Sequence, residues 1–256
     1  MSVLDSIIAG VREDLAKRRL PLSELREKLE SAPPVIDAHP GLRGDLISVI
    51  AEVKRSSPSK GSLATIADPA KLAEQYQQAG ASVISVLTEE RRFGGSLADL
   101  KSVRSAVDIP ILRKDFMVDE YQFYEARAYG ADVVLLIVAA LSARQLNDYF
   151  EMATELGMAS LIEVHTHDEL ERAMEISPRI IGINSRNLKT LEVDQKAFAE
   201  LLPEIPVEII KVAESGISAR GEVELARSFG ADAILVGEAL VRAGDPISAL
   251  RTLRGL

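Results

Sequence analysis

The sequence predicts a (β/α)8 TIM barrel of the α/β class, preceded by a helical extension. From about residue 46 onwards, eight short apolar runs alternate with longer segments of helical periodicity. Strands that alternate with helices form βαβ units and a parallel sheet, and eight such units close into a barrel of roughly 210 residues. Most of the runs also finish in a polar side chain, as expected where a barrel carries its active site.

A length of 256 residues suits one large barrel or two ordinary domains. The hydrophobic fraction of 47% is enough for a buried core. The formal net charge is -9, with 39 acidic against 30 basic residues. This balance argues against nucleic acid or anionic lipid as the main partner, since a phosphate-rich surface requires a basic stripe. A small anionic substrate remains compatible with a locally basic pocket.

The sequence contains no cysteine and three histidines. It therefore has no disulfide framework, no thiolate zinc site and no cysteine nucleophile. We expect His39, His165 and His167 to be caps or surface residues, and we expect no metal. A reducing cytoplasm fits this composition best.

Residues 1–45 are predicted to form the helical extension, and residues 46–256 the barrel domain. Amphipathic helices are expected near residues 3–18 and 22–31, before Pro33, Pro34 and Pro40 prevent a further helix. The first residues lack the apolar stretch of a signal peptide. No segment approaches the roughly 20 apolar residues that a membrane span needs, so we expect a soluble, untargeted protein.

The predicted strands follow one another at regular spacing. In order they are SVIAEVK, ASVISVL, IPILRK, ADVVLLIV, ASLIEVH, RIIGIN, VEIIKVAES and ADAILVG. Gly80, Gly130 and Gly230 each end a helical segment just before a strand, as helix-terminating glycines do. An open doubly wound sheet is the alternative, but such a sheet more often carries a G-x-G-x-x-G turn, which is missing here.

Polar side chains end five of the eight predicted strands. They are Glu52 and Lys54, Lys114, Glu163, Asn184, and Glu214. Strand periodicity places Glu52 and Lys54 on one face. A paired acid and base at the end of a buried strand indicates a working site, whereas an exposed edge strand with a surface ion pair is an equally good explanation of this segment alone. Lys114 and Arg113 must point to opposite faces, and the pattern leaves open which points inward. Two lysines and three glutamates at one barrel mouth form a plausible general acid and base set.

Two glycine turns predict a phosphate site. Gly216 lies in AESGI at 213–217, and Gly237 lies in LVGEAL at 235–240. Loops after strands 7 and 8 commonly bind phosphate through backbone N–H groups and a helix N-terminus. Ser57 and Lys60 in the loop after the first strand could add a hydroxyl and a charge, although solvation is the simpler expectation for Lys60. Lys54 could serve either the phosphate or a substrate carboxylate.

Phe93 and Phe116 follow the second and third predicted strands. They could line an apolar pocket for a flat ring. Packing of each loop onto the barrel is the alternative explanation for either residue.

Taken together, these motifs resemble the indole-3-glycerol phosphate synthase family of tryptophan biosynthesis. The resemblance covers nearly the whole chain and is carried, in family order, by IAEVKRSSPSKG, LRKDF, LIEVH, INSRNL, AESGI and LVGEAL. It implies closure of an indole ring from 1-(2-carboxyphenylamino)-1-deoxyribulose 5-phosphate, with release of carbon dioxide and water. Because aromatisation and decarboxylation drive that reaction, no redox or metal cofactor is expected.

The resemblance also implies catalytic roles. Lys114 would be the general acid on the ribulose carbonyl, and Lys54 would bind the anthranilate carboxylate. Glu163 and Glu52 would stabilise cationic intermediates and remove protons. A third group would orient the sugar hydroxyls or other catalytic side chains: Asn184, Arg186 and Glu214.

Further contacts are implied for the two ends of the substrate. Backbone N–H groups of Ser215, Gly216 and Gly237 would hold the phosphate. An apolar group would enclose the aromatic ring: Pro58, Phe93, Phe116, Leu135 and Ile137. Many relatives carry a small hydroxyl residue where this chain has Glu238, and a carboxylate cannot donate a hydrogen bond to phosphate. Only the backbone N–H of Glu238 would then serve there, and the helices of residues 1–45 would help to cover the substrate.

Two alternatives to this function remain. An isomerase of the same pathway, or another phosphosugar barrel, would share the phosphate loops but has no reason to combine EVKRSSPS with LRKDF. A catalytically silent barrel that binds a phosphorylated metabolite or a partner chain would not need Lys114 or Glu163, and both are present.

Overall fold

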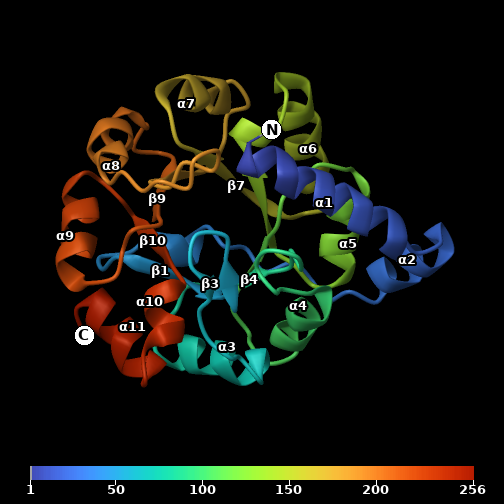
Figure 1. Cartoon of the computed structure of the whole chain (residues 1–256), viewed down its shortest axis with the longest axis horizontal. Coiled ribbons are helices and arrows are strands. Elements are labelled where there is room, and N and C mark those ends of the chain that lie inside the picture. The colour runs from blue at the N-terminus through green and yellow to red at the C-terminus, as the bar shows by residue number, and fades with distance from the viewer. Residues whose placement is uncertain (1) are drawn as a thin grey trace.

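Eight parallel strands close into a barrel in the computed structural model, which describes residues 2–256 apart from the side chain of Leu22 (Figure 1). Around the barrel the order is β1-β10-β9-β8-β7-β6-β5-β4. Their bounds are β1 Ser48–Val53, β4 Val83–Leu87, β5 Ile111–Lys114, β6 Val133–Ile137, β7 Ala159–Val164, β8 Ile180–Asn184, β9 Ile210–Glu214 and β10 Ala233–Val236. Each lies within one predicted run, so the closed barrel is confirmed and the open sheet was the wrong alternative.

Helices connect successive strands on the outside of the barrel (Figure 1). They are α3 Pro69–Gln78, α4 Leu97–Arg104, α5 Tyr121–Ala128, α6 Ala143–Glu155, α7 His167–Met174, α8 Lys196–Leu201, α9 Arg220–Ser228, the short α10 Glu238–Arg242, and α11 Pro246–Arg254. Single 3-10 turns lie at Pro40–Leu42, Val138–Ala140 and Leu202–Glu204. A small antiparallel hairpin of β2 Ser56–Ser57 and β3 Gly61–Ser62 follows β1.

Local sequence explains where the helices begin and end. The side chains of Asp68, Ser96 and Ser142 each accept a backbone N–H in the first turn of α3, α4 and α6, which satisfies a donor that the helix itself leaves free. Gly80 and Gly130 adopt φ values of 92° and 90° after α3 and α5. Only glycine reaches this left-handed region without strain, and it lets the chain turn back to the next strand.

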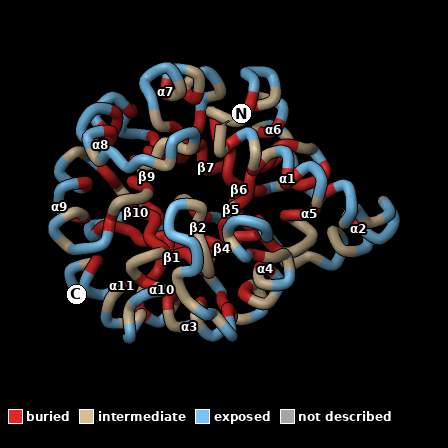
Figure 2. The backbone as a smooth tube through the Cα atoms, in the orientation of Figure 1, coloured by how far each residue is buried: buried red, intermediate tan, exposed pale blue. Residues whose placement is uncertain are grey.

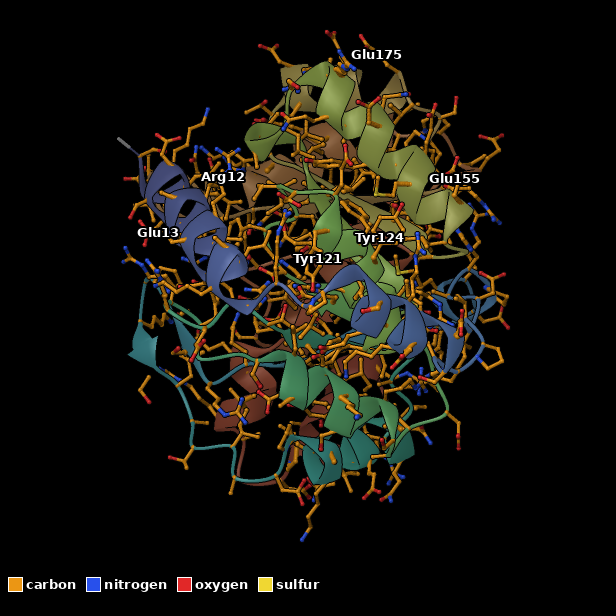
Figure 3. All side chains as sticks on the ribbon, turned by 90° about the vertical axis from the view of Figure 1, so that its right-hand side faces the viewer. Arg12, Glu13, Tyr121, Tyr124, Glu155 and Glu175 are labelled. Carbon is orange, nitrogen blue, oxygen red and sulfur yellow. The ribbon has the colours of Figure 1, made fainter. Side chains whose placement is uncertain are left out.

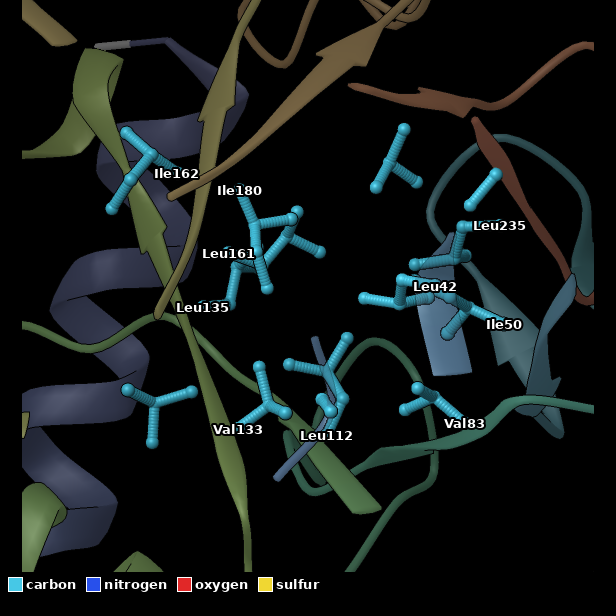
Figure 4. Packing of buried hydrophobic residues seen from close by; sticks show 14 of the residues in the cluster. Leu42, Ile50, Val83, Leu112, Val133, Leu135, Leu161, Ile162, Ile180 and Leu235 are labelled. Atoms are coloured by element: carbon cyan, nitrogen blue, oxygen red, sulfur yellow. The ribbon is translucent and has the colours of Figure 1, made fainter. Parts of the chain in front are cut away.

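The barrel interior is filled by apolar side chains from alternate positions of the strands. In register, Ile50 lies between Leu235 of β10 and Val83 of β4, and Leu135 lies beside Leu161. Figure 4 shows these side chains converging inside the ring of strands. Figure 2 shows that the strands are buried, whereas the helices expose their outer sides.

Two helices precede the barrel, α1 Val3–Arg18 and α2 Leu22–Glu30, close to the predicted ranges. Leu4, Ile7 and Val11 of α1 belong to the main core, whereas Leu15 packs with Leu25 and Tyr121 in a second cluster. Figure 3 looks onto these two helices and the tyrosines of α5 beside them. Within residues 2–256, no helix is both long and apolar enough to cross a membrane.

Candidate active site

A cavity of about 530 Å³ opens at the carboxyl ends of the eight strands, and every strand contributes to its wall. All the site residues predicted from the sequence line it. They are Glu52, Lys54, Ser57, Pro58, Phe93, Lys114, Phe116, Leu135, Ile137, Glu163, Asn184, Arg186, Glu214, Ser215, Gly216, Gly237 and Glu238. The structure therefore brings these residues together, while their individual roles remain predictions.

Lys114 occupies the centre of the charged group. Its Nζ lies 3.2 Å from Glu163 Oε2 and 3.7 Å from Glu214 Oε2. Burial disfavours the ammonium, but the carboxylates of Glu163, Glu214 and Glu52 outweigh it and hold the pKa of Lys114 above its usual value. Lys114 is therefore protonated at neutral pH, as a general acid must be.

Glu214 sits at the end of β9, opposite Asn184 of β8. Burial and the nearby carboxylate of Glu163 raise its pKa well above the usual value, although Lys114 acts in the opposite direction. Its Oε1 is buried without a hydrogen-bond partner. A Cβ atom on Gly182 would come within 2.0 Å of that oxygen, so the glycine leaves the space that Glu214 fills.

Glu52 and Lys54 form a second pair at the end of β1, with Nζ 2.8 Å from Oε1. The hydroxyl of Ser85 donates to the other oxygen of Glu52 at 3.2 Å. Burial opposes ionisation of Glu52, but Lys54 and Lys114 together hold its pKa below the usual value. This glutamate is therefore ionised, whereas Glu214 tends to keep its proton. The two carboxyls differ because their environments differ.

The polar side of β8 is arranged by a short hydrogen-bond chain. Asn184 Oδ1 accepts the backbone N–H of Arg186 at 3.0 Å, and Arg186 Nη1 donates to the carbonyl of Leu191 at 2.9 Å. These bonds hold the Arg186 side chain along the cavity rim. His165 Nδ1 lies 2.7 Å from the carbonyl of Asn184, and its neighbour Thr166 caps α7.

The predicted phosphate end has an unusual backbone. Ser215 and Gly216 have φ values of 67° and 71°, and for serine this left-handed conformation costs about 1–2 kcal/mol. The hydroxyl of Ser185 donates to the carbonyl of Ser215 at 3.1 Å, and Gln195 donates to the carbonyl of Gly216. Both residues line the cavity, and loops in this place after the seventh strand of a barrel commonly contribute to phosphate sites.

Gly237 completes this end of the cavity after β10. A Cβ atom there would lie 2.7 Å from Glu52 Oε1 and 3.0 Å from Glu52 Cβ. The glycine is therefore required for the close approach of the two strand ends.

Lys60 is exposed, as predicted, and it also forms an ion pair. Its Nζ lies 2.7 Å from Glu238 Oε1, and its side chain is 50% exposed. Arg242, one turn further along α10, approaches the same oxygen at 3.4 Å. Lys60 and Glu238 are 178 residues apart in sequence, so only the folded barrel places them together.

Two phenylalanines line the cavity from the loops that follow β4 and β5. The ring centroids of Phe93 and Phe116 lie 6.2 Å apart with a tilt of 42°. Leu135 and Ile137 add aliphatic surface from β6. This combination provides a slot for a flat apolar ring beside the charged group.

Sequence reasoning missed some of the cavity. Ile7 of α1 reaches its wall, and Leu188, Leu191, Val193 and Arg242 also line it. No strand-end pattern marks these residues, because helices and long loops carry them. Among the described residues, no group of three or more histidine, aspartate or glutamate side chains is placed to hold a metal ion.

The chain is similar to known proteins over almost its whole length. A family model described as indole-3-glycerol phosphate synthase matches residues 4–253. Indole-3-glycerol phosphate synthase 1 of Streptomyces coelicolor is 58% identical over 255 residues, covering 99% of this chain and 95% of that protein. The indole-3-glycerol phosphate synthase of Mycobacterium avium is 54% identical over 254 residues, covering 98% and 93%.

Solved structures support the fold. A 3-hexulose-6-phosphate synthase superimposes with a TM-score of 0.66 at 16% identity, covering 82% of this chain and 99% of that chain. A thiamine phosphate pyrophosphorylase from Pyrococcus furiosus superimposes with a TM-score of 0.62 at 18% identity, covering 84% and 96%. At such identities the likeness concerns the barrel architecture alone.

Proposed function

The chain belongs to the indole-3-glycerol phosphate synthase family of carboxy-lyases, and we propose that Lys114 is the general acid of its ring-closing reaction. The substrate is 1-(2-carboxyphenylamino)-1-deoxyribulose 5-phosphate, a phosphorylated small molecule. One observation carries the assignment of the acid. Among the cations that line the cavity, Lys114 is the one whose Nζ lies within 4 Å of two buried carboxyls, Glu163 at 3.2 Å and Glu214 at 3.7 Å.

The reaction needs a proton at the ribulose carbonyl oxygen when the new carbon–carbon bond forms. Lys114 supplies this proton, and the adjacent carboxyls can return one to it. Glu214 suits this second task, since burial and the neighbouring Glu163 raise its pKa and thereby favour its protonated form. General acid catalysis of this kind contributes about 10²–10⁴-fold.

The remaining polar residues of the site act on other atoms of the substrate. Lys54 binds the anthranilate carboxylate before it leaves as carbon dioxide. Glu163 and Glu52 stabilise the cationic intermediates and take up protons. Asn184 and Arg186 orient the sugar hydroxyls from the rim of β8, where hydrogen bonds already hold them.

The substrate spans the cavity between its two ends. The aromatic ring lies in the slot of Phe93 and Phe116, with Pro58, Leu135 and Ile137 around it. The phosphate lies at Ser215, Gly216 and Gly237, where backbone N–H groups bind it, with Ser57 adding a hydroxyl and Glu238 contributing only its own N–H. Residues 1–45 cover the mouth, and residues 46–256 form the catalytic barrel. We place the enzyme in the cytoplasm, which its cysteine-free sequence favours.

The assignment is tested by following indole fluorescence after adding the substrate to the wild type, Lys114→Met and Lys101→Met, without metal or cofactor. Lys101 is an exposed lysine on α4 and serves as the control. We expect turnover in the wild type and the control, and at least a hundredfold loss of kcat in Lys114→Met with substrate binding retained. A Lys114→Met variant that keeps a tenth or more of the wild-type kcat contradicts the assignment. A folded wild type that binds the substrate without turnover identifies the silent binding barrel instead.

A further inference from the structure

We propose that Glu238 is an internal counter-anion that holds Lys60 and Arg242 at the phosphate end of the cavity, and that the substrate's phosphate takes these two cations from it. This inference rests on the proposed function, because it requires the phosphate to lie at Ser215, Gly216 and Gly237. It assigns roles to two side chains, Lys60 and Arg242, that the reaction scheme above leaves unused.

The three side chains meet at a single atom. Glu238 Oε1 lies 2.7 Å from Lys60 Nζ and 3.4 Å from Arg242 Nη1. Glu238 directly follows Gly237, and all three side chains line the cavity. A carboxylate oxygen shared by two cations occupies the same kind of environment that a phosphate oxygen requires.

The position of Lys60 makes an exchange of partners feasible. It lies in the turn of the small hairpin of β2 and β3, and its side chain is 50% exposed. Arg242 is 48% exposed and Glu238 is 29% exposed. Ion pairs exposed to this degree are weak, so a stronger anion can replace the carboxylate at little cost.

The local charge balance favours such a replacement. Glu238, Lys60 and Arg242 together carry a net charge of +1, beside the paired Glu52 and Lys54. A phosphate monoester carries about -1.5 to -2 at neutral pH, so it binds both cations more strongly than one carboxylate does. Glu238 meanwhile repels the incoming phosphate. The carboxylate therefore keeps two flexible cations in place and also lowers the apparent affinity for the anion.

Removing the charge of Glu238 should change phosphate affinity in opposite directions for the exchange and for a purely positioning role of Glu238. If Glu238 only positions the two cations, removing its charge weakens phosphate binding. If Glu238 competes with the phosphate, removing its charge strengthens binding. In that case Lys60 also becomes more important once Glu238 is neutral, because it no longer has to leave a partner.

The test measures the inhibition constant of inorganic phosphate against substrate turnover at constant ionic strength. We expect Glu238→Gln to lower this constant about three- to tenfold, and Lys60→Met and Arg242→Met to raise it by a similar factor. Lys60→Met should have a larger effect in the Glu238→Gln background than in the wild type. Glu224→Gln is the matched control, because Glu224 pairs with Arg220 four residues before it on α9, outside the cavity, and it should change the constant less than twofold.

The outcomes separate this inference from the function on which it rests. An unchanged or higher inhibition constant in Glu238→Gln overturns the exchange, even when the wild type is inhibited competitively and turns over its substrate. Turnover without any competitive inhibition of the wild type by phosphate removes the phosphate site itself, and the exchange with it. Equal effects of Lys60→Met in both backgrounds also overturn the exchange.

Discussion

Arg113 and Lys114 are consecutive residues of β5 whose charged groups lie on opposite sides of the barrel wall. Lys114 points into the cavity toward Glu163. The guanidinium of Arg113 is fully buried on the outer side, where it donates to Asp115 at 2.9 Å and to Glu125 of α5 at 2.8 Å. The alternation of the strand thus separates a cation that lines the cavity from one buried in the wall of the barrel.

The Arg113 side chain is the centre of a larger buried network. Its Nε donates to Thr88 and its Nη1 to the carbonyl of Gln122. Arg18, at the end of α1, donates two hydrogen bonds of 3.0 Å to Glu125. The network therefore connects the N-terminal helix to the strand that carries Lys114.

Replacing Arg113 by methionine should destabilise the protein by about 3–5 kcal/mol, because the buried Asp115 would lose its cation and the buried Glu125 would keep only Arg18. The free energy of unfolding, measured in urea, checks this value. Arg144→Met is the control, since Arg144 is 91% exposed and pairs with Asp148 on the surface of α6. It should change stability by less than about 0.5 kcal/mol. A loss below about 1 kcal/mol in Arg113→Met would show that the network contributes little.

The contrast between these two residues shows what the sequence could predict. The apolar runs located every barrel strand, and the strand-end pattern located the charged group of the cavity. Local periodicity required Arg113 and Lys114 to face opposite ways, but it contains no information about which neighbour each meets. The partners of Arg113 come from α1 and α5, and Arg18 and Glu125 are 107 residues apart.

The same reason explains the parts of the cavity that the sequence did not indicate. Ile7 belongs to a helix that precedes the barrel, and its place at the cavity depends on how α1 packs across the mouth. The ion pair of Lys60 and Glu238 joins the first and last loops of the barrel, which meet only because β1 pairs with β10. Tertiary packing, rather than any local motif, produces both contacts.

Glu214→Gln should stabilise the protein at pH 8 while it impairs turnover. The folded-state pKa of Glu214 is raised by burial and by Glu163, so folding favours its protonated form. The contribution of protonated Glu214 to folding stability is complete below the pKa of Glu214 in the unfolded chain, near 4.5. It is lost as the pH rises toward the pKa of Glu214 in the folded protein. Glutamine stays neutral, so its advantage should be small near pH 4.5 and grow by up to about 1.4 kcal/mol per pH unit above it.

Urea unfolding of both proteins at pH 5 and pH 8 measures this difference. Glu222→Gln provides a control of opposite sign, because backbone N–H groups of Ser218 and Ala219 outweigh partial burial and lower the pKa of Glu222. That variant should be less stable than the wild type at pH 8. A Glu214→Gln variant that is less stable than the wild type at pH 8 would contradict a protonated Glu214.

Gly182→Ala should reduce kcat at least tenfold, because its new methyl group would lie 2.0 Å from Glu214 Oε1 and force that side chain away from Lys114. A displacement of about 1 Å in a catalytic group can cost about a hundredfold in rate. Gly221→Ala is the matched control, since no atom lies within 4 Å of the added methyl on α9. It should leave kcat unchanged and stabilise the helix by about 0.5–1 kcal/mol. Equal kcat values in the two variants would mean that Glu214 tolerates displacement.

Ile7→Ala and Leu15→Ala should separate the two contributions of α1. Both side chains are almost fully buried, at 4% and 2% exposure, so each truncation should cost about 2–4 kcal/mol of stability. Only Ile7 lines the cavity, whereas Leu15 packs against Leu25 and Tyr121 away from it. The KM for the substrate should therefore rise several-fold in Ile7→Ala and stay near the wild-type value in Leu15→Ala, at a temperature where both variants are folded. If both variants raise KM equally, the helix acts on the substrate through general stability rather than through contact at the mouth.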